Sequence, residues 1–271
     1  MKQRIISREY KIMLNQDCFV SSKINLIELS GEFWQDFKDA IKDIVIDTDG
    51  SLDYVKKRRN VRFYDSTAHH LRENNYVFRE RVDIDTGKRE VTLKYRHPDR
   101  YISQDRNMNA AVIENGKTKF EEDIKLPFKK LYSFSTKQPI SDNKNINKLK
   151  DIGKLYPGLK KELKSYQKDV PIDLVGGFTA RELVITGADF QIRKNPKVEA
   201  ECALIAWYDD SCGEDTPILV EFSFKYENKR EEYDCKAAQR AYDVFARLNN
   251  TFGKWVDSEG LTKTSYVYSR A

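Results

Sequence analysis

The sequence predicts an α+β fold in which a closed β-barrel of about eight strands encloses a polar lumen and helices pack on its apolar outside. Two observations lead to this prediction. Charged side chains recur two residues apart in several strand-like segments, so that one face of each strand is charged and the other is apolar. Three segments with apolar residues at helical spacing, at about 31–45, 145–166 and 235–256, can cover the apolar faces. An antiparallel sheet with one face in water explains any single strand equally well and is the alternative to the barrel.

The most informative segment is a hairpin over residues 76–97. Its turn is Asp85–Lys88, with Gly87 where a positive φ is expected. Four basic side chains share one face of the hairpin, two on each strand: Arg79, Arg81, Lys94 and Arg96. Because like charges that face each other destabilise a sheet, this face either lies in open water or holds an anion.

The segments before the hairpin alternate between strand and helix. Residues 4–14 are predicted to form a strand, and three side chains share its polar face: Ser7, Glu9 and Lys11. Ser30 is the expected N-cap of a helix that runs to about Val45. A further strand ends near Asp65, and a loop or short helix is expected over 66–75.

A change of pattern follows the hairpin. Residues 98–116 are polar and irregular, and we expect an exposed excursion there. The strand 119–124 carries three charged side chains on one face: Lys119, Glu121 and Asp123. Residues of about 127–170 have helical spacing interrupted by Pro and Gly, and they are interpreted as a helical insertion within a single domain that spans residues 1–271.

The last third of the chain returns to strands and ends with a helix. Strands are expected at four places: 178–185, 188–193, 198–208 and 218–227. The last of these strands has an aromatic face on one side and, on the other, a polar face that includes Glu221 and Ser223. Asp234 is the expected N-cap of the C-terminal helix at about 235–256, and the tail after Gly260 is expected to dock as a short strand.

Composition limits the classes of function. The 48 Lys and Arg residues nearly balance the 43 Asp and Glu residues, and a net charge of +5 is too small to indicate nucleic-acid binding by itself. No apolar run approaches the roughly 20 residues of a membrane helix, and no apolar signal segment is seen, so we expect a cytoplasmic protein with no membrane partner. Four scattered cysteines are expected to be free thiols: Cys18, Cys202, Cys212 and Cys235. The three histidines lack the pattern of a His-ligated metal or a catalytic triad.

A polar lumen built from these strands would have a definite chemistry. Its cations would bind a multiply charged anion such as a polyphosphate. Its carboxylates would bind a divalent metal that bridges to this anion, and carboxylate oxygens suit Mg²⁺ or Mn²⁺.

Short motifs follow one another along most of the chain: Ser7–Lys11, Tyr64–Ser66, Phe78–Arg81, Thr92–Lys94, Lys119–Asp123, Arg181 and Glu221–Ser223. In this order they resemble the strand motifs of the CYTH superfamily, also called the triphosphate tunnel metalloenzymes. The family's motifs are E-x-E-x-K, Y-D, R-x-R, T-x-K, R-x-E-x-E, a single arginine and E-x-E. The resemblance implies an eight-stranded antiparallel tunnel that hydrolyses or transfers phosphate from a triphosphate-containing small molecule with Mg²⁺ or Mn²⁺.

The resemblance also implies a role for each group of residues. It assigns binding of the phosphates to six basic residues: Lys11, Arg79, Arg81, Lys94, Arg96 and Arg181. It assigns the metal to four carboxylates: Glu9, Glu121, Asp123 and Glu221. Glu9 and Lys11 are the implied catalytic pair, and no covalent intermediate is implied.

The chain departs from the family on the acidic side, because Ser7 and Ser223 stand where the family has carboxylates. A serine does not replace the charge of a carboxylate at a Mg²⁺ site.

Three functions are therefore considered. The first is a metal-dependent phosphohydrolase, a triphosphatase that cleaves the terminal phosphate of inorganic triphosphate or of a nucleoside or organic triphosphate. The second is a catalytically weak polyphosphate- or nucleotide-binding module of the same fold. The third, nucleic-acid binding on a basic sheet, is disfavoured because Tyr95 should face away from its basic neighbours. The physiological substrate is not indicated, and a homo-oligomer is left open.

Overall fold

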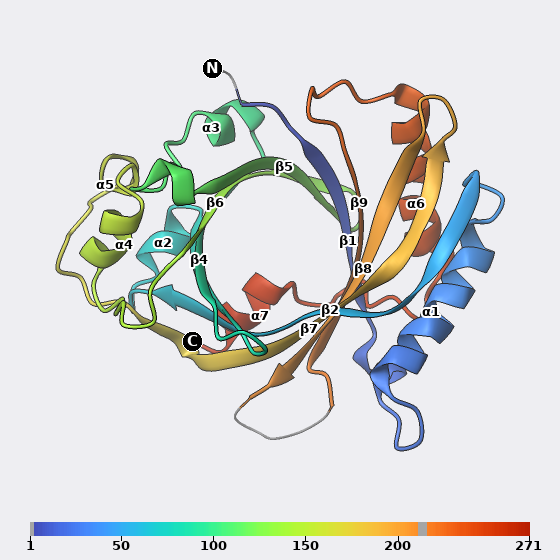
Figure 1. The fold of residues 1–271 in the computed structure, drawn as a ribbon, viewed down its shortest axis with the longest axis horizontal. Helices are drawn as coiled ribbons and strands as arrows, with labels where there is room; N and C mark the ends of the chain where they lie inside the picture. Colours follow the sequence, from blue (N-terminus) through green and yellow to red (C-terminus); the bar gives the residue numbers. More distant parts are fainter. Residues whose placement is uncertain (1–2, 211–215) are drawn as a thin grey trace.

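The strands of this protein form one sheet that closes on itself into a barrel (Figure 1). The structure is a computed structural model that describes residues 3–210 and 216–271. The strands are β1 Ser7–Leu14, β2 Asp47–Asp65, β3 Tyr76–Asp83, β4 Arg89–His97, β5 Lys117–Lys125, β6 Lys129–Pro139, β7 Asp173–Arg193, β8 Val198–Asp209 and β9 Leu219–Glu227. Around the barrel they follow the order β1-β5-β6-β4-β3-β2-β7-β8-β9.

The α+β class and the ring of strands agree with the prediction, but the number and direction of the strands differ from it. Within the described residues there are nine strands instead of eight, and β1 pairs with β5 in parallel. The extra strand is β6, which lies within 127–170, a range predicted to be helical. Its inward positions carry Leu131, Ser133, Ser135 and Lys137, and this alternation lacks the charged pairs that mark the other strands.

One strand, β7, is longer than the sequence indicates. The 21-residue β7 joins the predicted strands 178–185 and 188–193, with a register shift against β8 between Ile185 and Asp189. Gly187 lies in this irregular stretch with a φ of +117°, and a Cβ at Gly50 of β2 would lie 1.9 Å from its carbonyl oxygen. Glycine at both positions therefore lets β2 and β7 stay paired where the sheet bends.

Two apolar clusters attach helices to the outer face of the barrel. In the first, α1 (Leu26–Ile41) and α6 (Cys235–Thr251) cover outward side chains of β1, β7, β8 and β9. In the second, α4 (Leu149–Leu155) and α5 (Leu159–Glu162) cover those of β3 to β6. Figure 1 shows the two pairs on opposite sides of the ring. The apolar strand faces point outwards under helices, as the sequence predicts.

The start of α1 was placed too late by the sequence pattern. Its N-cap is Asn25, whose side chain accepts hydrogen bonds from the backbone N–H groups of Ile27 and Glu28. The predicted cap, Ser30, lies inside the helix, and its hydroxyl donates to the carbonyl oxygen of Leu26 at 2.7 Å. A serine inside a helix commonly bonds to the carbonyl four residues earlier, so its presence alone does not locate the N-terminus. Asp234, by contrast, caps α6 as predicted.

The C-terminal tail differs most from its prediction. Instead of a short strand it forms the helix α7 (Lys263–Ser269), which lies inside the ring in Figure 1. Val267 and Tyr268 pack on apolar side chains of β2, β7 and β8, including Val61 and Phe63 on the inward face. The Tyr268 hydroxyl donates to Asp65 at 2.8 Å. The expectation that all helices lie outside the barrel is therefore wrong for α7, because part of the inner wall is apolar.

The segment 98–116 is only partly exposed. It contains α3 (Arg100–Gln104) and a 3₁₀ turn, and the side chains of Val112 and Ile113 are exposed as expected. Met108, however, is buried in the second apolar cluster. The expectation of an exposed excursion therefore fails at Met108.

Two expectations from composition concern the whole chain. Cys18, Cys202 and Cys235 are free thiols, and Cys212 lies outside the described residues. None of the helices in residues 3–210 and 216–271 has the length and apolar character needed to cross a membrane.

The packing of α1 on the barrel gives a stability prediction. Phe33 is fully buried and meets Phe222 of β9 edge-on, with 5.0 Å between ring centroids. Phe33→Ala should lower the free energy of unfolding by about 3–5 kcal/mol, because the lost contacts leave a cavity. Urea denaturation measures this loss. Ile113→Ala, at a side chain that is 70% exposed, is the control and should change it by less than about 0.5 kcal/mol. Equal effects of the two substitutions would contradict the packing described.

Candidate functional site

The lumen of the barrel contains a charged cavity of about 330 Å³. Strand alternation brings to it side chains from β1, β3, β4, β5, β6 and β9, because inward positions of paired strands lie side by side. The charged side chains that line it are Glu9, Lys11, Arg79, Arg81, Lys94, Arg96, Lys117, Lys119, Glu121, Lys125, Lys137, Glu221 and Lys263. A volume of this size is typical of a small-molecule site.

Nine of the ten site residues predicted from the sequence lie on the inner face. Eight line the cavity: Glu9, Lys11, Arg79, Arg81, Lys94, Arg96, Glu121 and Glu221. The ninth, Asp123, is fully buried beside Lys11 on the neighbouring strand. The hairpin 76–97 therefore presents its four cations to the lumen, as its alternation predicts.

Arg181 is the predicted residue that the structure does not bring to the site. It is paired with Tyr208 of β8, and its guanidinium lies 4.8 Å from the centroid of that tyrosine ring. The next residue, Glu182, takes the inward position, opposite Arg59 of β2. Neighbouring strand residues face opposite sides, so the inward position of Glu182 turns Arg181 outwards.

Arg79 and Arg81 lie at the inner face of β3, and Arg81 Nε lies 3.8 Å from Glu182 Oε1 of β7. Within the described residues, the Nε atoms of both arginines are buried and have no hydrogen-bond partner. Burial, together with the positive charge of Arg59, lowers the pKa of Arg81 to about 10. Burial and the adjacent charge of Arg81 likewise lower the pKa of Arg79. Each guanidinium would be stabilised by a bound anion.

The carboxylates on the opposite wall are each held by a cation. The Lys11 ammonium lies 2.8 Å from Glu9 Oε2 and 2.8 Å from Asp123 Oδ1. The second oxygen of Asp123 accepts a hydrogen bond from Ser133 and lies 3.4 Å from Arg96 Nε. Burial alone would raise the pKa of Asp123, but the surrounding cations, with Lys11 the foremost, hold it well below its usual range. Asp123 is therefore a permanent anion at this wall.

The four predicted metal ligands do not form a metal site. In the part of the chain that the structure describes, no group of three or more His, Cys, Asp or Glu side chains is placed to hold a metal ion. Glu9 and Asp123 are bound to Lys11, and Glu221 Oε1 lies 2.7 Å from Lys263 Nζ. Mg²⁺ requires several oxygen ligands in near-octahedral geometry. The donor set present does not fit that requirement.

Several charged residues of the lumen were missed by the sequence reasoning. The two that extend the alternation of β5 could have been found by counting two residues beyond each end of its charged face: Lys117 and Lys125. Lys137 was missed because β6 was predicted to be helical. Glu182 bonds to the indole N–H of Trp207 at 2.8 Å, and nothing local distinguishes it from Arg181.

Lys263 reaches the lumen from α7, far along the chain from the strand motifs. The Lys263 ammonium contacts Glu221. The hydroxyl of the adjacent Thr264 accepts a hydrogen bond from Arg96 Nη1 at 3.3 Å. Both residues line the cavity together with Thr262. The polar tail gave no signal of this position, since its contacts arise only when α7 docks inside the barrel.

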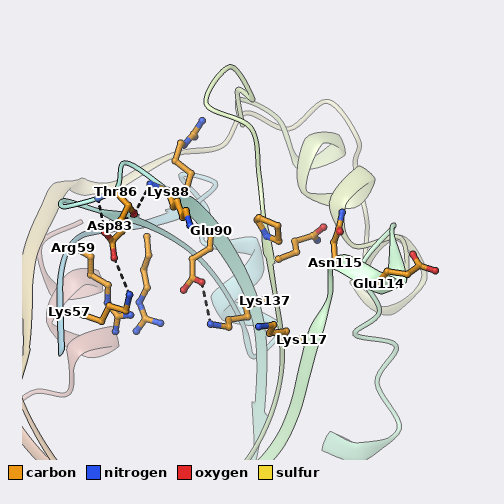
Figure 2. A pocket seen from close by; sticks show the side chains of 14 residues that line it. Lys57, Arg59, Asp83, Thr86, Lys88, Glu90, Glu114, Asn115, Lys117 and Lys137 are labelled. Carbon is orange, nitrogen blue, oxygen red and sulfur yellow. Dashed lines mark hydrogen bonds and ion pairs between the residues drawn. The ribbon is translucent and has the colours of Figure 1, made fainter. Parts of the chain in front are cut away.

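A second cavity of about 540 Å³ forms a mouth to the lumen, and Figure 2 shows its lining. Arg81, Lys117 and Lys137 line both cavities, so the mouth adjoins the lumen. Two of the mouth's carboxylates are paired with lysines, Asp83 with Lys57 at 3.3 Å and Glu90 with Lys137 at 3.3 Å. None of the 14 lining residues drawn in Figure 2 is aromatic.

Comparisons with known proteins found likenesses in fold alone. No protein-family model matches the chain, and no curated protein matches it. A candidate adenylyl cyclase from Hippeastrum with a dominant triphosphatase activity has a TM-score of 0.47 and 12% identity, over 98% of this chain and 96% of its own. A candidate adenylate cyclase from Vibrio parahaemolyticus has a TM-score of 0.37 and 11% identity, over 98% and 99%. Another from Bacillus halodurans has a TM-score of 0.37 and 14% identity, over 91% of each chain.

Proposed function

We propose that the lumen binds the phosphate chain of a triphosphate-containing small molecule and that the protein is a phosphohydrolase that releases the terminal phosphate. The observation that carries the proposal is the pair Arg79 and Arg81, whose buried Nε atoms have no hydrogen-bond partner in the described residues. Buried polar atoms without partners destabilise a protein, and phosphate oxygens would supply the partners. Lys94 and Arg96, on the neighbouring strand, would hold the same chain.

The mouth favours inorganic triphosphate over a nucleotide. A nucleotide base is usually held by aromatic stacking or an apolar wall. The mouth offers Lys57, Lys88, Lys117 and Lys137 and no aromatic side chain among its lining residues. A ligand that is charged along its whole length suits this lining better than one that ends in a base.

Catalysis is proposed for Glu9 and Lys11, and the cations of the lumen would stabilise the charge that develops on the transferred phosphoryl group. The family resemblance implies Mg²⁺ or Mn²⁺ as cofactor. The carboxylates of the lumen are paired with lysines and do not fit that ion, so no step of the proposed reaction is assigned to it.

A second candidate function is binding of the phosphate chain without turnover. It is favoured by the same ion pairs, because a carboxylate bound to an ammonium is a poor base for activating water. Nucleic-acid binding on an open basic sheet is not proposed, because the basic faces that suggested it line the lumen.

Arginine substitutions test the binding site. Arg81→Ala should weaken binding of inorganic triphosphate by about 10- to 100-fold, since hydrogen bonds to charged groups contribute about 1.5–3 kcal/mol. Isothermal titration calorimetry measures this affinity. The matched control is Arg181→Ala. This arginine of β7 lies over the Tyr208 ring instead of in the lumen, so the variant should bind triphosphate as tightly as the wild type. A loss of affinity in Arg181→Ala as large as in Arg81→Ala would refute the site.

Phosphate release separates the two candidate functions. Wild-type protein and Glu9→Gln should be incubated with inorganic triphosphate and with ATP, in EDTA, in Mg²⁺ and in Mn²⁺. A phosphohydrolase should release phosphate at least about 100-fold faster than Glu9→Gln, in the range that general acid–base groups contribute. Equal rates in the two proteins, with tight binding retained, would leave the binding module as the function.

The lysines of the lumen predict how binding depends on pH. Burial and the nearby positive charges of Arg96 and Lys11 lower the pKa of Lys94 to about 8, and the pKa of Lys125 falls to about 8 for the same causes. The anion binds the charged forms, so affinity should be full below about pH 7 and should fall as the pH rises through 8. Calorimetry of triphosphate binding at pH values between about 6.5 and 9.5 measures this fall in affinity.

Lys94→Arg is the control for the titration of the ligand itself. An arginine stays charged over this range, so the variant should show a shallower fall in affinity than the wild type. Identical pH profiles in the two proteins would show that Lys94 does not contact the anion.

A further inference from the structure

We propose that two lysines, Lys11 and Lys263, supply in this lumen the two positive charges that a divalent cation would bring, so that the phosphate chain binds without a metal ion. The inference rests on the proposed binding function and concerns only how the acidic wall is neutralised. It is carried by the contacts of the three carboxylates Glu9, Asp123 and Glu221.

Lys11 neutralises the first two carboxylates. Glu9 on β1 and Asp123 on β5 are register partners in the parallel pair, and both face the lumen. The Lys11 ammonium touches one oxygen of each at 2.8 Å. The nitrogen therefore lies between the two carboxylates, where a bridging metal ion would also have to lie.

Lys263 neutralises the third carboxylate. Its ammonium lies 2.7 Å from Glu221 Oε1, and its side chain is 15% exposed. The helix that carries it is held inside the barrel by the hydrogen bond that the Tyr268 hydroxyl donates to Asp65, and its first turn is capped by Thr262, whose hydroxyl accepts from the backbone N–H of Ser265. The docked helix thus positions the Lys263 ammonium beside Glu221.

The remaining oxygen of Asp123 is also occupied. It accepts from Ser133 and lies 3.4 Å from Arg96 Nε and 3.6 Å from Lys94 Nζ. A metal ion would have to displace a cation from each carboxylate, leaving buried ammonium groups without partners, which is strongly unfavourable. The serines at positions 7 and 223 fit this arrangement, because a wall with fewer carboxylates needs fewer positive charges to balance it.

The first experiment compares binding with and without metal in the wild-type protein. Inorganic triphosphate should be titrated calorimetrically in EDTA and then in excess Mg²⁺ or Mn²⁺. The affinity in EDTA should equal or exceed that with metal, since the metal complexes the free ligand. Binding more than about tenfold tighter with metal would overturn the inference while supporting the proposed function. Absence of binding under every condition would instead refute the proposed function.

The second experiment needs no phosphate ligand, so it tests the inference even if that binding fails. Mn²⁺ binding is measured by the loss of the electron paramagnetic resonance signal of the free ion. Wild-type protein should bind Mn²⁺ weakly or not at all. Lys11→Met leaves Glu9 and Asp123 side by side without their cation and should bind Mn²⁺ at least about tenfold more tightly.

Controls keep this test decisive. Lys263→Met, which frees Glu221, is the second variant should Lys11→Met fail to fold, and it should also gain Mn²⁺ affinity. Lys236→Met changes an exposed lysine of α6 and should behave as the wild type. Wild-type protein that binds Mn²⁺ as tightly as either lumen variant would overturn the inference.

Discussion

The Lys11 ammonium between Glu9 and Asp123 is the interaction on which the lumen depends. Asp123 has no exposure to solvent, and an unpaired carboxylate there would be strongly unfavourable. The parallel pairing of β1 with β5 sets Glu9 beside Asp123, and Lys11, two residues further along β1, bonds to both. The pairing of β1 with β5 thus closes the barrel and also places Lys11 where it neutralises Glu9 and Asp123.

The barrel can contain so much charge because only part of its interior is polar. On the side of β2, β7 and β8 much of the inner wall is apolar, apart from the ion pair of Arg59 with Glu182, and Val267 and Tyr268 of α7 pack against the apolar part. On the other side the wall carries the cations and carboxylates of the site. The tail connects the two halves, because the helix that packs on the apolar wall also brings Lys263 to Glu221. Docking of α7 therefore completes both the hydrophobic core and the electrostatics of the lumen.

The sequence predicts the features that depend on the two-residue period of a strand. Alternation is a local property of each strand, so the sequence correctly groups the hairpin cations, Glu9 and Glu221 on the charged faces, which line the lumen. Alternation cannot decide which of two adjacent charged residues faces inwards, and for Arg181 and Glu182 the neighbouring strands decide it. β6 was missed because its inner face is Ser133 and Ser135, without a charged pair.

The position of Lys263 lay beyond any local pattern. Its contact with Glu221 spans distant parts of the chain and forms only when α7 lies inside a closed barrel. The same limit applies to the metal expectation. The motifs identify the carboxylates correctly as residues of the inner face, but they do not show that Lys11 bonds to Glu9 of its own strand, or that Asp123 and Glu221 meet cations of other elements.

The walls of the lumen are therefore unequal in charge, and this inequality would orient the anion of the proposed function. On β1, β5 and β9 each carboxylate is balanced by a neighbouring cation, so these strands present little net charge. On β3, the Nε atoms of Arg79 and Arg81 are buried without a hydrogen-bond partner among the described residues, and Arg81 Nε lies 3.8 Å from Glu182 Oε1. Burial and the positive charge of a neighbouring arginine lower the pKa of each guanidinium. A phosphate chain would gain most by bonding to β3 and β4, with Lys11 and Glu9 across the lumen from it. Arg81, Lys117 and Lys137 line both the mouth and the lumen, so on the proposed function an anion that enters would meet positive side chains from the mouth to that wall.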